Sequence, residues 1–160
     1  GSMRAEDFIE NTGSALHSYE KTDLTLYFGN EEGTALEEEV LEEVRYNTNL
    51  STEKLVMERL LKGPASKQLR PVLDSQIRLV GTSVKDGICY VNFDDTFLRQ
   101  ESELDPTLQI EAIVRSVIEN GKQIRAVQIL INGKSDQNYK GISLEQPFDI
   151  ESAGQKGEKQ

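Results

Sequence analysis

Apolar and polar residues alternate with a period of two near the start of the chain. Leu24, Leu26 and Phe28 are separated by single residues, and the turn-forming run Asn-Glu-Glu-Gly follows at 30–33. A period of two is typical of a strand with one buried face, because successive side chains point to opposite sides of a sheet. The pattern therefore predicts a first strand that ends at this turn.

Residues 34–46 fit two structures. A helix would begin with a capping box formed by Thr34 and Glu37 and would gather the apolar residues in one stripe. That stripe would consist of Leu36, Val40, Leu41 and Val44. A strand would separate an apolar face from a charged face. Its apolar face would hold Leu36, Val40, Val44 and Tyr46, and its charged face Glu37, Glu39, Glu43 and Arg45. Local propensity favours the helix, but the pattern alone leaves both structures open.

Two amphipathic helices are predicted, at residues 51–62 and 105–120. Ser51 can cap the first helix, and Gly63 followed by Pro64 ends it. The second helix repeats apolar residues at the i, i+3, i+4, i+7 spacing of one helical face. These residues are Ile110, Ile113, Val114, Val117 and Ile118.

A β-hairpin is predicted from residues 77–84 and 88–95, which flank Asp86 and Gly87. This dipeptide favours a two-residue type I′ turn between alternating runs. Pairing across the turn predicts a single buried face on which apolar or small residues meet. The predicted pairs are Val84 with Cys89, Thr82 with Val91 and Val80 with Phe93.

Residues 124–131 carry apolar side chains at both even and odd positions, which predicts a central strand covered on both faces. Asn132 and Gly133 then turn the chain towards residues 139–150. The order of elements is ββαββαβ when 34–46 is a strand. This order predicts an α+β domain with a mixed sheet of about five strands and two helices packed on it.

The chain is expected to form one domain, at residues 23–150. Gly1-Ser2-Met3 looks like the remnant of a cleaved expression tag, and residues 1–22 are expected to form a flexible tail. Residues 151–160 carry no large apolar side chain and are expected to be a disordered tail. A native signal segment is expected to have been removed with the tag; if Met3 is the genuine start instead, a cytoplasmic protein is expected.

Charge and residue usage exclude several classes of function. The 160 residues include 18 basic and 28 acidic ones, a formal charge of −10, which repels nucleic acid and anionic lipid. The only histidine, His17, falls in the expected tail, so it is not held in register with a base or a metal. The only cysteine, Cys89, is expected on the buried hairpin face, where a thiol acts as a small apolar group.

The carboxylates offer no convincing catalytic or metal site. A dense acidic cluster lacks the glycine-turned loop of a calcium site and is expected to be a solvated face. Its members are Glu37, Glu38, Glu39, Glu42 and Glu43. Two carboxylate pairs share only their residue type with the catalytic pair of a glycosidase. These pairs are Asp94 with Asp95 and Glu101 with Glu103. No catalytic, cofactor-binding or metal-binding residues are therefore assigned, and we expect no enzyme activity and no cofactor.

Five segments, in order and at suitable spacing, resemble the GerM domain of sporulation and spore germination proteins. They span residues 26–34, 55–64, 84–94, 113–117 and 127–134. The resemblance implies that residues 34–46 are a strand, because packing against neighbours often overrides local propensity. It also implies a fold similar to the ring-building domains of sporulation and secretion assemblies. Family positions matched by Gly63, Pro64, Asp86, Gly87 and Phe93 each have a structural reason.

The same resemblance implies a function. Family members are commonly lipoproteins outside the cytoplasmic membrane, so the chain is expected to be a non-catalytic interaction or assembly module anchored there through an N-terminal lipid. Its expected partner is another envelope protein or a second copy, with peptidoglycan nearby and no nucleic acid. The alternative is a domain that binds cell-wall glycan or peptide. Sporulation members often carry two tandem copies, whereas no second repeat is found here.

Overall fold

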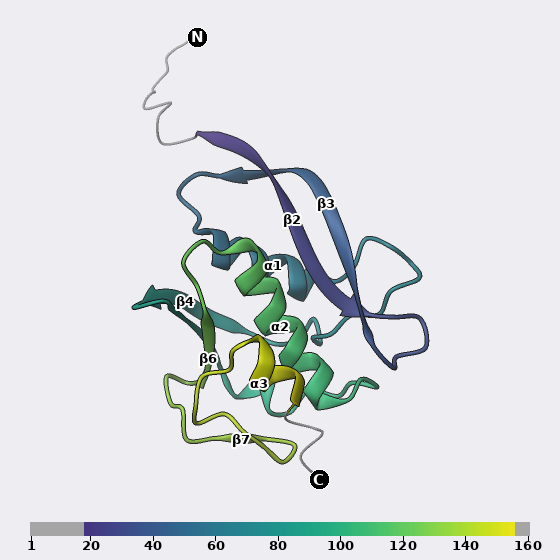
Figure 1. Cartoon of the computed structure of the whole chain (residues 1–160), viewed down its shortest axis with the longest axis vertical. Coiled ribbons are helices and arrows are strands. Elements are labelled where there is room, and N and C mark those ends of the chain that lie inside the picture. Colours follow the sequence, from purple (N-terminus) through teal and green to yellow (C-terminus); the bar gives the residue numbers. More distant parts are fainter. Residues whose placement is uncertain (1–17, 156–160) are drawn as a thin grey trace.

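The computed structural model of the chain describes residues 18–155, which form an α+β domain as predicted (Figure 1). The first half contains β2 (Tyr19–Gly29), β3 (Leu36–Asn47), α1 (Thr52–Lys62), β4 (Leu79–Lys85) and β5 (Ile88–Phe93). The second half contains the short 3₁₀ helix η2 (Asp95–Phe97), α2 (Pro106–Asn120), β6 (Ala126–Ile131), β7 (Asn138–Tyr139), β8 (Ile142–Ser143) and α3 (Ile150–Gln155). None of the helices within residues 18–155 has both the length and the apolar character needed to cross a bilayer.

Residues 36–47 form a strand, β3, which pairs antiparallel with β2. A β-bulge interrupts this pairing, so that Asp23 of β2 faces both Glu42 and Glu43 of β3. Glu43 adopts a positive φ of 54°, and its N–H donates to Asp23 Oδ1 at 2.9 Å. An extra residue reverses the side-chain alternation beyond it. The predicted apolar face was therefore wrong for Val40, which points outward with 51% of its surface exposed.

The second sheet has the order β4-β5-β6, with β4 and β5 antiparallel and β5 and β6 parallel. Asp86 and Gly87 both have positive φ, as a type I′ turn requires. The predicted pairs Val84–Cys89 and Thr82–Val91 are confirmed. The predicted partner of Phe93 was wrong, because an irregularity between Leu79 and Gly81 makes Leu79 that partner.

The five long strands form two separate sheets instead of the single sheet expected (Figure 1). Helix α2 packs against β2 and also contacts α1, α3 and β6. Two polar side chains of α2 form hydrogen bonds with backbone groups along the outer edge of β2. The N–H of Tyr27 donates to Ser116 Oγ at 3.0 Å, and Asn120 pairs with Thr25 through Thr25 N–H (3.0 Å) and Thr25 C=O (2.7 Å). Because the helix occupies this edge, no strand of the second sheet can pair with it.

Strand β6 is buried on both faces, as predicted, but β5 and not β6 is the central strand. The outer edge of β6 is covered by the chain that follows it. Val127 and Phe148 exchange two backbone hydrogen bonds of 2.8 Å, and Gln128 Nε2 donates to the C=O of Leu144 at 2.7 Å. The C-terminal segment therefore replaces a neighbouring strand.

The folded unit is wider than residues 23–150. Strand β2 begins at Tyr19, and α3 continues to Gln155 with Ala153 fully buried. Asp149 and Ser152 cap α3 reciprocally, through Ser152 N–H to Asp149 Oδ1 (2.7 Å) and Asp149 N–H to Ser152 Oγ (3.0 Å). The burial of Ala153 and these capping bonds stabilise the helix although residues 151–155 lack large apolar side chains. The expected tails at 1–17 and 156–160 lie outside the described residues.

Candidate functional site

An open groove of about 880 Å³ lies between the loop after α1 and the loop before α2. Its apolar surface includes Leu61, Pro64, Leu69, Leu73 and Leu104. Its charged lining residues carry both signs and are Lys62, Lys67, Arg70, Asp74, Glu101 and Glu103. We refer to this hollow as the α1–α2 groove.

A carboxylate of β3 positions the first part of the groove wall. Glu39 accepts the N–H of Ala65 at 3.0 Å through Oε1 and the N–H of Ser66 at 2.9 Å through Oε2. The turn that starts this loop depends on Gly63, whose φ of 95° is rarely adopted by L-residues. Glu39 therefore has a structural role that separates it from the other members of the acidic cluster.

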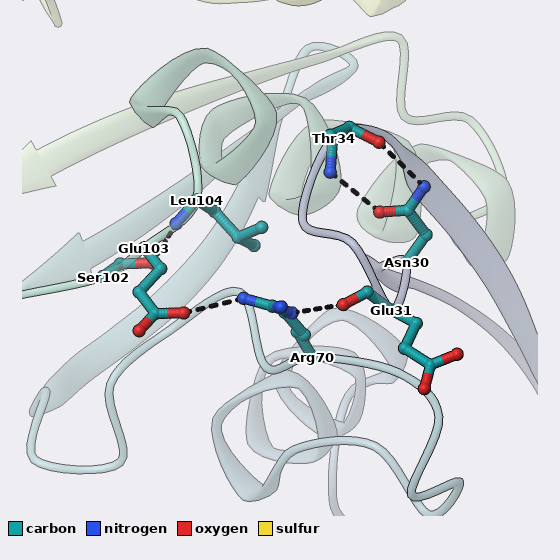
Figure 2. A network of polar contacts seen from close by, with 7 residues as sticks. All are labelled: Asn30, Glu31, Thr34, Arg70, Ser102, Glu103 and Leu104. Carbon is teal, nitrogen blue, oxygen red and sulfur yellow. Dashed lines mark hydrogen bonds and ion pairs between the residues drawn. The ribbon is translucent and has the colours of Figure 1, made fainter.

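Arg70 joins the groove wall to the β2–β3 turn (Figure 2). Its backbone exchanges two hydrogen bonds with Gly29, of 2.8 and 2.9 Å. Its guanidinium donates through Nε to the C=O of Glu31 and through Nη1 to Glu103 Oε1, each at 2.7 Å (Figure 2). A Cβ at Gly29 would lie 2.9 Å from Leu104 Cδ2, so a larger residue at this crossing would displace the Leu104 side chain. One arginine thus links three segments around the groove.

A buried network of amide groups lies beneath both walls. Gln109 of α2 is fully buried, and its Nε2 donates to the C=O of Val72 at 2.7 Å and to Gln100 Oε1 at 3.0 Å. Tyr139 Oη donates to Gln109 Oε1 at 2.6 Å, and Gln100 Nε2 donates to the C=O of Phe97 at 3.0 Å. These bonds tie the segments that carry the two walls to the core.

The sequence analysis missed this network because Gln109 was not recognised as buried. A signal was present in the helical spacing, since Gln109, Ala112 and Ser116 follow one another at intervals of three and four residues. All three are buried on α2. Polar residues on a buried helical face need partners, and that requirement could have pointed to both Gln109 and Ser116.

Cys89 was considered as a nucleophile, and His17 as a member of a catalytic triad or a zinc site. Cys89 is fully buried, and desolvation, with a smaller effect of the Glu53 charge, raises its pKa to about 12. A thiol with such a pKa is protonated at neutral pH and does not react as a thiolate. His17 lies outside the described residues.

The paired carboxylates have structural partners. Asp94 caps η2, and hydrogen bonds from the hydroxyl and then the N–H of Thr96 lower its pKa. Asp95 forms an ion pair of 2.9 Å with Arg99. Glu101 is exposed at the α1–α2 groove, and Glu103 is bonded to Arg70.

The rest of the acidic cluster lies along β3. Glu37, Glu38 and Glu42 are exposed, and Glu43 lies 3.6 Å from Lys21. Within residues 18–155 no three metal-binding side chains lie close enough together to hold an ion. The α1–α2 groove therefore combines an apolar surface with charges of both signs.

Comparison with known proteins agrees with this fold. The family described as Germane, sporulation and spore germination, matches residues 25–137, which is more than half of the chain. The search of curated proteins gave no significant match.

Solved structures with a similar fold include the following three. The tandem GerMN domains of the sporulation protein GerM from Bacillus subtilis match with a TM-score of 0.65 and 21% identity over 90% of this chain, which spans only 49% of that protein chain. The first GerMN domain of that protein matches with a TM-score of 0.60 and 17% identity, over 81% of this chain and 95% of the domain chain. A protein from Clostridium perfringens, named as a candidate lipoprotein, matches with a TM-score of 0.56 and 23% identity, over 82% and 89%. None of these descriptions names an enzymatic activity.

Proposed function

Since the chain belongs to the Germane family of sporulation and spore germination domains, we propose that it is a non-catalytic interaction module of an envelope lipoprotein. In this proposal the domain lies outside the cytoplasmic membrane and binds a polypeptide segment of another envelope protein in the α1–α2 groove. The description of the similar Clostridium perfringens protein as a candidate lipoprotein supports the location.

The observation that carries the proposal is the composition of the groove. Leu61, Pro64 and Leu69 are partly exposed in its lining, and Lys67 and Glu101 are exposed and carry opposite charges. Apolar anchors surrounded by polar residues are the usual anatomy of a protein-binding surface. A rim of both signs fits a polypeptide, which carries charges of both signs, better than a uniformly anionic polymer.

The walls of the groove are also fixed before any partner binds. Arg70, Glu39 and Gln109 hold the two loops through hydrogen bonds of 2.7 to 3.0 Å. A pre-organised surface loses less conformational entropy on binding, which increases affinity. The loops therefore serve as a binding surface and need not close like a lid.

The proposal is tested by chemical cross-linking and capture from solubilised envelope extract, with mass spectrometry of the captured protein. Lys67→Glu reverses an exposed charge in the groove, and Lys134→Glu makes the same change at an exposed position that does not line it. We expect the wild type and Lys134→Glu to capture the same envelope protein, and Lys67→Glu to lose it.

Equal capture by both variants, or no capture by the wild type, would contradict the proposal. The alternative of wall binding is checked by calorimetric titration with purified peptidoglycan fragments. Saturable binding of these fragments, weakened by Lys67→Glu and without a captured protein, would replace the interaction module by a wall-binding domain.

A further inference from the structure

The two main sheets have four outer edges, and the chain itself covers two of them. Ser116 and Asn120 satisfy the backbone of β2, and the segment around Phe148 pairs with β6. An uncovered edge exposes unpaired N–H and C=O groups that can pair with another chain. The edges that remain uncovered within residues 18–155 belong to β3 and β4.

The edge of β3 carries features that oppose pairing with another strand. The strand contains five glutamates, and the bulge at Glu42 and Glu43 breaks its regular alternation. Charged side chains and bulges are the devices by which proteins protect exposed edges. Strand β3 is therefore protected although none of the described residues pairs with its outer edge.

The edge of β4 carries less of this protection, namely one irregularity and one terminal lysine. Residues 79–84 (Leu-Val-Gly-Thr-Ser-Val) carry no charge, and the irregularity lies at Val80, so the strand pairs regularly from Gly81 to Lys85. Val80 is 60% exposed and Val84 43% exposed. A two-residue hairpin is closed by a hydrogen-bonded pair, here Lys85–Ile88, so the alternation turns the N–H and C=O groups of Thr82 and Val84 away from β5.

The surroundings of β4 indicate what it would bind. Arg78 precedes the strand, Lys85 ends it, and Lys122 is exposed nearby in a second groove of about 490 Å³. Leu24, Tyr46 and Ile124 line this groove together with Val84, and the carboxylates Asp23 and Glu53 also line it. None of these three cations forms an ion pair with another residue in the range 18–155, although the chain as a whole has a charge of −10.

We propose that the outer edge of β4 is a docking site for an extended segment of a partner protein, which adds to the sheet as an antiparallel or parallel strand. The segment alternates apolar residues, which cover Val84 and the neighbouring groove, and carries carboxylates at its ends, which meet Arg78, Lys85 and Lys122. Backbone hydrogen bonds give such a complex its affinity and the side-chain pockets its specificity. The site shares no lining residue with the α1–α2 groove, so it goes beyond the proposed function and can fail independently of it.

The test uses two fluorescein-labelled peptides with the same alternating Val-Thr core, one flanked by glutamates and one by lysines. Fluorescence anisotropy at low salt is expected to show about tenfold tighter binding of the glutamate-flanked peptide, and added salt should reduce this preference. Amide shifts in ¹⁵N spectra are expected in residues 79–85. Equal affinity for the two peptides, absence of binding, or shifts confined to the α1–α2 groove would overturn the proposal.

Two sets of variants locate the site. Thr82→Pro removes an outward N–H, which an edge strand tolerates, and should weaken binding of the glutamate-flanked peptide at least about tenfold. Thr82→Val keeps the N–H, so its affinity should stay within about twofold of the wild type.

Lys85→Glu with Lys122→Glu changes only exposed side chains and should reverse the preference towards the lysine-flanked peptide. Unchanged preference in this charge variant overturns the proposal even where Thr82→Pro does not fold. Concentration-dependent self-assembly that Thr82→Pro abolishes, without peptide binding, would also overturn it, since the occupant would then be a second copy.

Discussion

Replacing Tyr139 by phenylalanine tests whether the buried amide network stabilises the fold. The change removes the hydroxyl that donates to Gln109 Oε1 at 2.6 Å and keeps the ring, whose centroid lies 4.9 Å from that of Phe97. Gln109 is fully buried, so its Oε1 cannot turn to bulk water for a replacement donor. The variant therefore isolates one hydrogen bond.

The expected loss follows from the acceptor that remains. A buried polar atom left without a partner costs about 1–3 kcal/mol. At about 2 kcal/mol, a chain of this size should lose roughly 4–8 °C in Tm. Gln109 also donates to the C=O of Val72 and to Gln100 Oε1. Amide hydrogen exchange around the walls of the α1–α2 groove should therefore be faster in Tyr139→Phe than in the wild type.

Urea unfolding followed by circular dichroism measures this loss, with Tyr46→Phe as the matched control. The hydroxyl of Tyr46 lies 3.5 Å from Glu20 Oε1 in an exposed position, so its removal should cost less than about 0.5 kcal/mol. The slope of the unfolding free energy against urea should be the same in both variants, because the area exposed on unfolding does not change. A loss for Tyr139→Phe no larger than that for Tyr46→Phe would refute the reasoning.

Two further predictions use the same assay. Ser116→Ala leaves the buried N–H of Tyr27 without its acceptor and should lower the unfolding free energy by about 1–3 kcal/mol. The control Ser75→Ala changes an exposed serine and should alter the unfolding free energy by less than about 0.5 kcal/mol. Equal losses in the two variants would show that α2 does not stabilise the edge of β2. Burial raises the pKa of Tyr139 from 10.0 to about 12, so both folded and unfolded states hold the proton below pH 10, and only the unfolded state releases it between pH 10 and 12. The unfolding free energy of the wild type should therefore fall over this interval more steeply than that of Tyr139→Phe, and parallel curves would contradict the burial of the hydroxyl.

Several elements could be predicted because short-range chemistry determines them. Ser51 and Asp105 accept N–H groups at the first turns of α1 and α2 at the expected positions. Asp86 and Gly87 form the expected turn, and two of the three pairs next to it are confirmed. The order of five segments was enough to identify the family, which the match over residues 25–137 confirms.

The candidate site was far less accessible to prediction. The α1–α2 groove arises where the loops after α1 and before α2 meet, and neither loop has a periodic pattern that places it. Arg70 and Glu103 are 33 positions apart, and Gln109 and Tyr139 are 30 apart. The partner of each residue could not be predicted from the sequence, because these contacts depend on how the whole chain is folded.

The sequence by itself determined α1, α2, the hairpin and the family, since caps, turn residues and hydrophobic periods act between residues close in the chain. The tertiary structure decided the division into two sheets, the edges that are covered, and the conformation of the loops around the groove. Those outcomes depend on hydrogen bonds that buried backbone groups form with residues far away in the chain. The N–H of Tyr27, for example, donates to Ser116, which is 89 positions away. That requirement is a property of the packed chain, so no local pattern expresses it.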